Sequence, residues 1–183
     1  MKFYRHIHIC FVIYLLIALN AFAAHFNPVD ATGKSEPVVI QSANINGTTI
    51  QTGDEIAVYD KEQNICVGST IFSGSFPVSI TIWKEVDIQD DIFLSGAKNG
   101  NTMQFKIWQQ DNNSEHIAQA TITKGSSQFG NFLTVVSVLN VQIPDINLSH
   151  SSYHFGSIEL EQTASQTFSI MNAGAALLSV TAL

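Results

Sequence analysis

Cysteine and positive charge are scarce in this chain, and each scarcity excludes a class of protein. The 183 residues include two cysteines, Cys10 and Cys66, and 8 lysines and arginines against 15 aspartates and glutamates. Cys10 lies in an N-terminal apolar run that we expect to be removed. Cys66 is then unpaired, so the fold must be stabilised by apolar burial rather than by a disulfide. The formal net charge of -7 argues against a nucleic-acid partner.

Sequence signals of catalysis are also missing. The Gly-x-Ser-x-Gly nucleophile elbow is absent, and Ser73-Gly74-Ser75 is typical of an ordinary turn. His150 and His154, four residues apart, would need a helix to share a zinc ion, but they fall in an expected β region. Cys66 is expected to be a small buried hydrophobe rather than a nucleophile. We therefore expect that the chain is not an enzyme.

The first 23 residues have the pattern of a secretory signal peptide. Lys2 and Arg5 precede the apolar run of residues 9–19, and Ala21-Phe22-Ala23 supplies small residues for cleavage before Ala24. The run is short for a membrane span, and no later stretch approaches the roughly 20 apolar residues that a spanning helix needs. We expect a mature chain without a transmembrane segment that is secreted, extracellular or at the cell surface, with the periplasm also possible.

Beyond residue 23 the chain shows the signals of strands and no sustained helical periodicity. Asn46-Gly47 is typical of a two-residue hairpin turn. Residues 76–83 and 102–108 alternate apolar and polar side chains, as half-buried strands do. The expected strands cover residues 38–45, 48–51, 55–59, 65–72, 76–83, 102–108, 116–123 and 132–141. Short strands with turns at this spacing predict an all-β fold, a β-sandwich of the jelly-roll or immunoglobulin-like type, over residues 24–142.

Two groups of carboxylates have a spacing that could hold a calcium ion, which prefers six to eight oxygen ligands. Neither group matches an EF-hand loop, and acidic turns between strands are usually only solvated. The residues are Asp54, Glu55 and Asp60 in the first group and Asp87, Asp90 and Asp91 in the second. Calcium is the one cofactor that this pattern leaves open.

Trp83 and Trp108 are the remaining candidates for a binding site. In the alternating pattern of its strand, each tryptophan falls on the same face as the polar residues. Both could therefore face outward, where an indole ring can stack on a sugar. The alternative is that each tryptophan covers the rim of the sandwich at the end of its strand.

The first part of the chain resembles a known bacterial module. His25-Phe26-Asn27-Pro28 is followed by Gly53-Asp54-Glu55-Ile56, by Cys66-Val67-Gly68 and by Phe105-Lys106-Ile107-Trp108. Over about residues 26–141 this pattern is similar to a β-rich module that recurs in large secreted and cell-surface proteins of bacteria. The resemblance implies a β-rich fold and no particular reaction.

A second resemblance begins after Ile143-Pro144, which is a plausible linker. Tyr153-His154-Phe155-Gly156 and the later Asn172-Ala173-Gly174 resemble the opening strands of an immunoglobulin-like domain of the ASPM, SPD-2 and Hydin family. Glu161 stands where that family usually has glycine. A complete domain of this kind needs about 100 residues, so residues 143–183 are expected to be a partial second module and the chain a fragment of a longer product.

These observations lead to two hypotheses on function. The first is a non-catalytic structural or binding module of a modular secreted or cell-surface bacterial protein, whose partners are other domains or surface proteins. The alternative is an accessory carbohydrate-binding module of a polysaccharide-active enzyme, whose partners are glycans. Further immunoglobulin-like repeats downstream would favour the first, and a hydrolase domain the second.

Overall fold

The computed structural model describes residues 24–88 and 92–181, and these residues form an all-β structure without a helix. The predicted all-β sandwich is therefore confirmed. The predicted signal peptide lies outside the described residues. The strands are β1 (Ser35–Ile40), β2 (Ala43–Ile45), β3 (Thr48–Thr49), β4 (Glu55–Asp60), β5 (Ile65–Ile71), β6 (Val78–Trp83), β7 (Val86–Asp87), β8 (Phe93–Leu94), β9 (Met103–Gln109), β10 (Ser114–Lys124), β11 (Thr134–Val141), β12 (Ile146–Leu148) and β13 (Ile170–Asn172).

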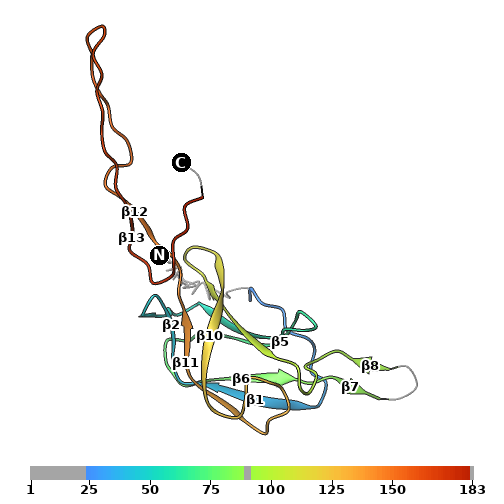
Figure 1. Cartoon of the computed structure of the whole chain (residues 1–183). Coiled ribbons are helices and arrows are strands. Elements are labelled where there is room, and N and C mark those ends of the chain that lie inside the picture. Colours follow the sequence, from blue (N-terminus) through green and yellow to red (C-terminus); the bar gives the residue numbers. More distant parts are fainter. Residues whose placement is uncertain (1–23, 89–91, 182–183) are drawn as a thin grey trace, which may run out of the picture.

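The sandwich has two layers that share one long strand. In one layer β1 lies between β6 and β11, and in the other β4 lies between β5 and β9. Residues 114–118 of β10 pair with β9, whereas residues 119–124 pair with β11, so β10 passes from one layer to the other (Figure 1). Its pairing with β11 shifts register on either side of Ile122. Such irregularities let a strand bend at the corner of a sandwich.

The core lies between the layers and follows the period-two pattern of the sequence. Ile80 and Ile82 of β6 and Phe105 and Ile107 of β9 are all buried, as their parity predicts. Buried apolar side chains of β1, β4 and β11 join them, among them Val38, Ile40, Ile56, Val58, Val136 and Leu139. Because side chains alternate along a strand, the residues between these buried ones point outward.

The predicted hairpin at Asn46-Gly47 is present, but the strands around it are shorter than expected. Asn46 and Gly47 have φ values of 49° and 79°, as a type I′ turn requires. The expected strand 38–45 is interrupted at Gln41-Ser42, where the carbonyl of Ser42 accepts a hydrogen bond from Leu139 N at 2.9 Å. β1 and β2 therefore pair in succession with the same strand, β11, in parallel. The returning strand β3 ends at Thr49.

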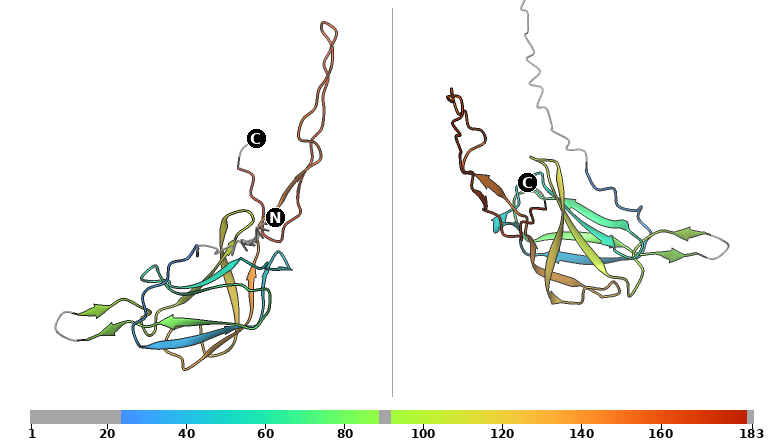
Figure 2. Two further views of the ribbon diagram at one scale, coloured as in Figure 1. Left: turned by 180° about the vertical axis from the view of Figure 1, so that it is seen from behind. Right: turned by 45° about the horizontal axis from the view of Figure 1, so that its top comes forward.

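Between β6 and β9, where the sequence predicts no strand, the described residues form two short strands, β7 and β8. β7 and β8 pair as a short antiparallel hairpin that projects from the sandwich (Figures 1 and 2). After β8 the chain returns to the sandwich, where Ala97 N donates to the carbonyl of Trp83 at 2.8 Å.

Residues 144–181 extend away from the sandwich as a narrow two-stranded segment (Figures 1 and 2). β12 and β13 pair with one another over three residues each. Asn172 fixes the turn beside them, since its Oδ1 accepts from Asp145 N and from Gly174 N at 3.0 Å each. The apolar side chains of this segment are exposed, with Leu160 at 93% and Leu177 at 91%. The domain boundary near residue 143 and the immunoglobulin-like identity of this segment remain predictions.

Candidate functional site

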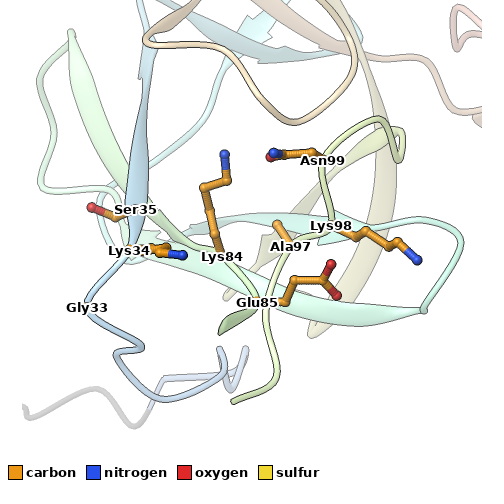
Figure 3. Close-up of a pocket in the computed structure, with 8 residues that line it drawn as sticks. All are labelled: Gly33, Lys34, Ser35, Lys84, Glu85, Ala97, Lys98 and Asn99. Atoms are coloured by element: carbon orange, nitrogen blue, oxygen red, sulfur yellow. The ribbon is translucent and has the colours of Figure 1, made fainter. Parts of the chain in front are cut away.

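A pocket of about 650 Å³ opens at the end of the sandwich where β1 begins and β6 ends. Lys34 stands just before β1, Lys84 follows β6, and Lys98 and Asn99 come from the chain between β8 and β9. Figure 3 shows the side chain of Asn99 pointing toward the end of the Lys84 side chain, while Lys98 extends away from both. Three lysines from separate parts of the sequence therefore meet at one hollow.

This concentration of lysine contrasts with the rest of the chain. Without Lys2 and Arg5 of the predicted signal peptide, the 8 basic residues become six lysines, and all 15 acidic residues remain. Three of those six lysines line the pocket, where Glu85 is the acidic lining residue. The pocket is thus a cationic spot on an acidic protein, and such a spot attracts anions.

Lys84 is held by a buried glutamate, Glu36. Its Nζ lies 3.3 Å from Glu36 Oε2, which also accepts a hydrogen bond from Gly130 N at 2.9 Å. Glu36 is 3% exposed, and its other oxygen, Oε1, has no hydrogen-bond partner within the described part of the chain. The charge of Lys84 is therefore compensated, whereas Lys34 and Lys98 are exposed at the rim.

Asp60, at the end of β4, positions the Lys98 side of the pocket. Its carboxylate accepts from Lys98 N at 3.0 Å, from Asn101 Nδ2 at 2.9 Å and from Gln63 N at 3.1 Å. Burial alone would raise the pKa of Asp60, but these hydrogen bonds outweigh it and lower the pKa below the ordinary value of 3.8. The ionised carboxylate of Asp60 thus fixes the position of residues 98–101 by hydrogen bonds.

Gly96 allows this loop to approach the strand that carries Lys84. A Cβ at Gly96 would lie 2.4 Å from the carbonyl carbon of Lys84, so no other residue fits without a shift of backbone. Glu85 N donates to the carbonyl of Ala97 at 3.0 Å, and Lys84 N donates to that of Lys34 at 2.9 Å. The walls of the pocket are therefore bound to one another by backbone hydrogen bonds.

The structure places the first group of calcium candidates at three separate points. Asp54 accepts from Gln51 N at 2.8 Å and from Gln110 N at 3.0 Å. Glu55 accepts from His25 N and Phe26 N, and Asp60 holds the loop described above. Each of these carboxylates bonds to its own donors, so the three do not share a ligand sphere.

The second group of calcium candidates is only partly described. Asp87 lies on β7, while Asp90 and Asp91 lie outside the described residues. Among the residues that are described, no three His, Cys, Asp or Glu side chains come together in a way that could hold a metal ion.

The two tryptophans differ in their surroundings. Trp108, on β9, stacks on the ring of His25 at 4.7 Å between ring centroids, and its Nε1 donates to Asn113 Oδ1 at 3.0 Å. One face of Trp108 is thus already covered. Trp83 ends β6, is half-buried and immediately precedes Lys84 of the pocket. The structure does not bring the two tryptophans into one binding surface, since they lie on strands of different layers.

Cys66 is buried on β5, as expected. Burial raises the pKa of its thiol to about 11, and its Sγ lies 3.7 Å from the carbonyl oxygen of Gly68. A thiol with this pKa is almost entirely protonated at neutral pH and is a poor nucleophile.

Sequence reasoning missed two features, the lysine pocket and the role of residues 24–29. The lysines are far apart in the sequence, and only the folded chain brings them together. Residues 24–29 cover the outer side of β4, and the sequence of β4 contained a signal of this. Its residues 56–59 form a continuous apolar run, Ile-Ala-Val-Tyr. Such a run is typical of a strand that is covered on both faces.

Comparison of the chain with protein-family models, with characterised proteins and with solved structures finds no match. Over residues 24–88 and 92–181, no helix has the length and apolar character needed to cross a membrane.

Proposed function

We propose that this chain is a non-catalytic binding module of a modular exported protein, and that the lysine pocket binds an acidic ligand. The observation that carries the proposal is the meeting of Lys34, Lys84 and Lys98 at one hollow of a strongly acidic chain. The negative surface repels anions and the positive pocket attracts them, so the pocket selects anions that are small or narrow enough to enter it.

The lining of the pocket narrows the ligand class. Glu36 compensates the charge of Lys84, and Glu85 adds a negative charge to the lining, which disfavours a compact polyanion such as a polyphosphate. Ser35 and Asn99 add a hydroxyl and an amide that can bond to neutral hydroxyl groups. Widely spaced carboxylate or sulfate groups among hydroxyls fit this lining, and acidic polysaccharides have that chemistry.

The non-catalytic part of the proposal is supported by the surroundings of the nucleophiles. Ser114 Oγ lies 2.8 Å from His116 Nε2, but the same nitrogen lies 3.2 Å from Gln109 Oε1. No carboxylate among the described residues hydrogen-bonds to this histidine to orient it as a general base. Cys66, the other nucleophile type, is buried and protonated.

Binding to a panel of polymers tests the proposal. The chain is titrated calorimetrically with polyuronate, with a sulfated polysaccharide, with neutral dextran and with polyglutamate, each at low and at physiological salt. The proposal predicts binding to an acidic polysaccharide that weakens with salt, and none to dextran. Binding to dextran alone would instead favour the sugar-stacking alternative, and binding to none of the polymers would contradict a pocket for acidic polysaccharides.

A further inference from the structure

Residues 24–29, which we call the strap, lie over the outer face of β4, β5 and β9. The outward side chains of this face come from Glu55, Tyr59, Cys66, Lys106 and Trp108, and we call them the cradle. Every residue of β4 except Tyr59 is buried, which shows that the strap covers the outer side of a strand whose inner side faces the core.

Glu55 is the central polar contact of the cradle. It is 1% exposed, and its two oxygens accept hydrogen bonds from His25 N at 2.6 Å and from Phe26 N at 3.1 Å. Both donors belong to the strap, and within the described residues Glu55 forms no ion pair with a lysine or histidine. A buried carboxylate without its donors is costly, so Glu55 is built to receive two successive backbone N–H groups.

The strap side chains fit the cradle on either side of this contact. Phe26 is buried against Ala57 and Cys66 and meets the ring of Tyr59 edge-on at 6.0 Å. His25 lies flat on Trp108, and its Nε2 is 3.3 Å from Glu115 Oε2. Lys106 completes the surface, since its Nζ lies 2.8 Å from Glu115 Oε1 and 4.1 Å from the centre of the Tyr59 ring.

The strap is nevertheless weakly tied to the sheet by its backbone. One backbone–backbone hydrogen bond joins the described part of the strap to the cradle, from Val29 N to the carbonyl of Cys66 at 2.9 Å. The strap is therefore recognised by its side chains and by one carboxylate, as a bound peptide is, rather than paired as a strand. Segments with few backbone hydrogen bonds open at lower free energy than the sandwich around them.

We propose that the cradle is a peptide-binding site, filled here by the chain's own strap, and that the sandwich keeps its fold when the strap leaves. The strap of a second copy of this chain can then bind in its place. The cradle recognises three features of a bound peptide. These are two consecutive backbone N–H groups that donate to Glu55, a flat ring that stacks on Trp108, and an aromatic side chain that fills the space over Cys66, which we call the recess.

Cys66 provides a direct readout, because the strap covers it. In the chain that starts at Ala24, which lacks Cys10, Phe26→Ala removes the side chain that packs over Cys66 and leaves the thiol in place. The labelling rate of Cys66 by a thiol reagent is measured alongside the cooperativity of thermal unfolding. We expect labelling about 10- to 100-fold faster than in the unmodified chain, the range that corresponds to burial of one aromatic side chain, with a cooperative unfolding transition retained.

A synthetic peptide with the sequence of residues 24–30 is then added to the Phe26→Ala chain. The proposal predicts that this peptide slows labelling again in a saturable manner, and that the same peptide with alanine in place of its phenylalanine does not. Loss of cooperative unfolding in Phe26→Ala would overturn the proposal, because the strap would then be an inseparable part of the core. Labelling that no concentration of the peptide slows would overturn it as well.

The milder variant His25→Ala keeps the recess filled and serves as the second test. It loses the stacking on Trp108 and the contact with Glu115, so a smaller rise in labelling is expected, again reversed by the peptide. Unchanged labelling in both variants would show that the strap does not control access to Cys66 and would overturn the proposal.

Discussion

The rings of His25 and Trp108 lie parallel, with an interplanar angle of 5° and 4.7 Å between their centroids. Trp108 is the cross-strand neighbour of both Glu55 and Glu115, and His25 contacts the carboxylates of both. One residue of the strap thus joins three adjacent strands on the outer face. A sugar could stack on this face of Trp108 only after His25 had moved away.

Replacement of the tryptophans by alanine is expected to affect stability more than glycan binding. Trp108→Ala removes the stacking with His25 and the hydrogen bond to Asn113, and Trp83→Ala removes a half-buried ring at the end of β6. We predict a loss of about 1–3 kcal/mol in the free energy of unfolding for each variant, measured by urea denaturation. An unchanged unfolding free energy combined with lost glycan binding would reverse this assignment.

Substitution of Glu55 by glutamine is expected to destabilise the chain although the shape of the side chain is kept. The amide presents an NH₂ group where one of two backbone donors needs an acceptor, and this mismatch is buried. We predict a loss of about 1–3 kcal/mol in the unfolding free energy. Glu159→Gln, at an exposed position of the C-terminal segment, is the matched control and is expected to change little. An equal effect of the two variants would contradict the role given to Glu55.

Asp60 is expected to make stability depend on pH in the acid range. Its pKa is lowered in the folded chain, so its contribution is present above the ordinary value of 3.8 and is lost as the pH falls through the lower folded value. Asp60→Asn should lose about 1–3 kcal/mol in unfolding free energy at neutral pH. It should also show a smaller further loss than the unmodified chain on acidification to a pH of about 3. Parallel pH profiles of the two chains, measured by urea denaturation, would contradict this account.

The sandwich could be predicted because its inner faces obey a local rule. Ile80, Ile82, Phe105 and Ile107 alternate with polar residues, and Asn46-Gly47 specifies its own turn, so the sequence near each position contains the information. The break at Gln41 and Ser42 in the expected strand 38–45 was not predictable in this way. It depends on pairing with a distant strand, since β1 and β2 pair with successive parts of β11.

The candidate sites were harder to predict, because they depend on contacts between distant residues. Asp54, Glu55 and Asp60 are close in sequence and suggested a shared cation, but alternation along β4 puts Glu55 and Asp60 on opposite faces of the sheet. Each carboxylate is then satisfied by N–H donors from another part of the chain. Likewise Lys34, Lys84 and Lys98 are separated by up to 64 residues and meet only after folding.

The C-terminal segment is expected to be sensitive to protease. Its apolar side chains are exposed and its strands β12 and β13 are three residues long, so few contacts oppose local opening. We predict that limited proteolysis cuts first near residues 143–152 and leaves a stable fragment that contains residues 26–141. Resistance of the whole chain as one unit would show that this segment packs on the sandwich and that the proposed boundary is wrong.

The lysine pocket is tested most directly by the affinity of the chain for the acidic polysaccharide it binds best, measured with and without the two rim lysines. Lys34→Ala/Lys98→Ala removes the uncompensated charges of the pocket, whereas Lys124→Ala removes an exposed lysine at the end of β10. We predict that the double variant binds about tenfold or more weakly and with a reduced dependence on salt, since exposed charge contacts are worth up to about 1 kcal/mol each. Lys124→Ala should bind as the unmodified chain does. Equal affinity of all three proteins would contradict the proposed function of the pocket.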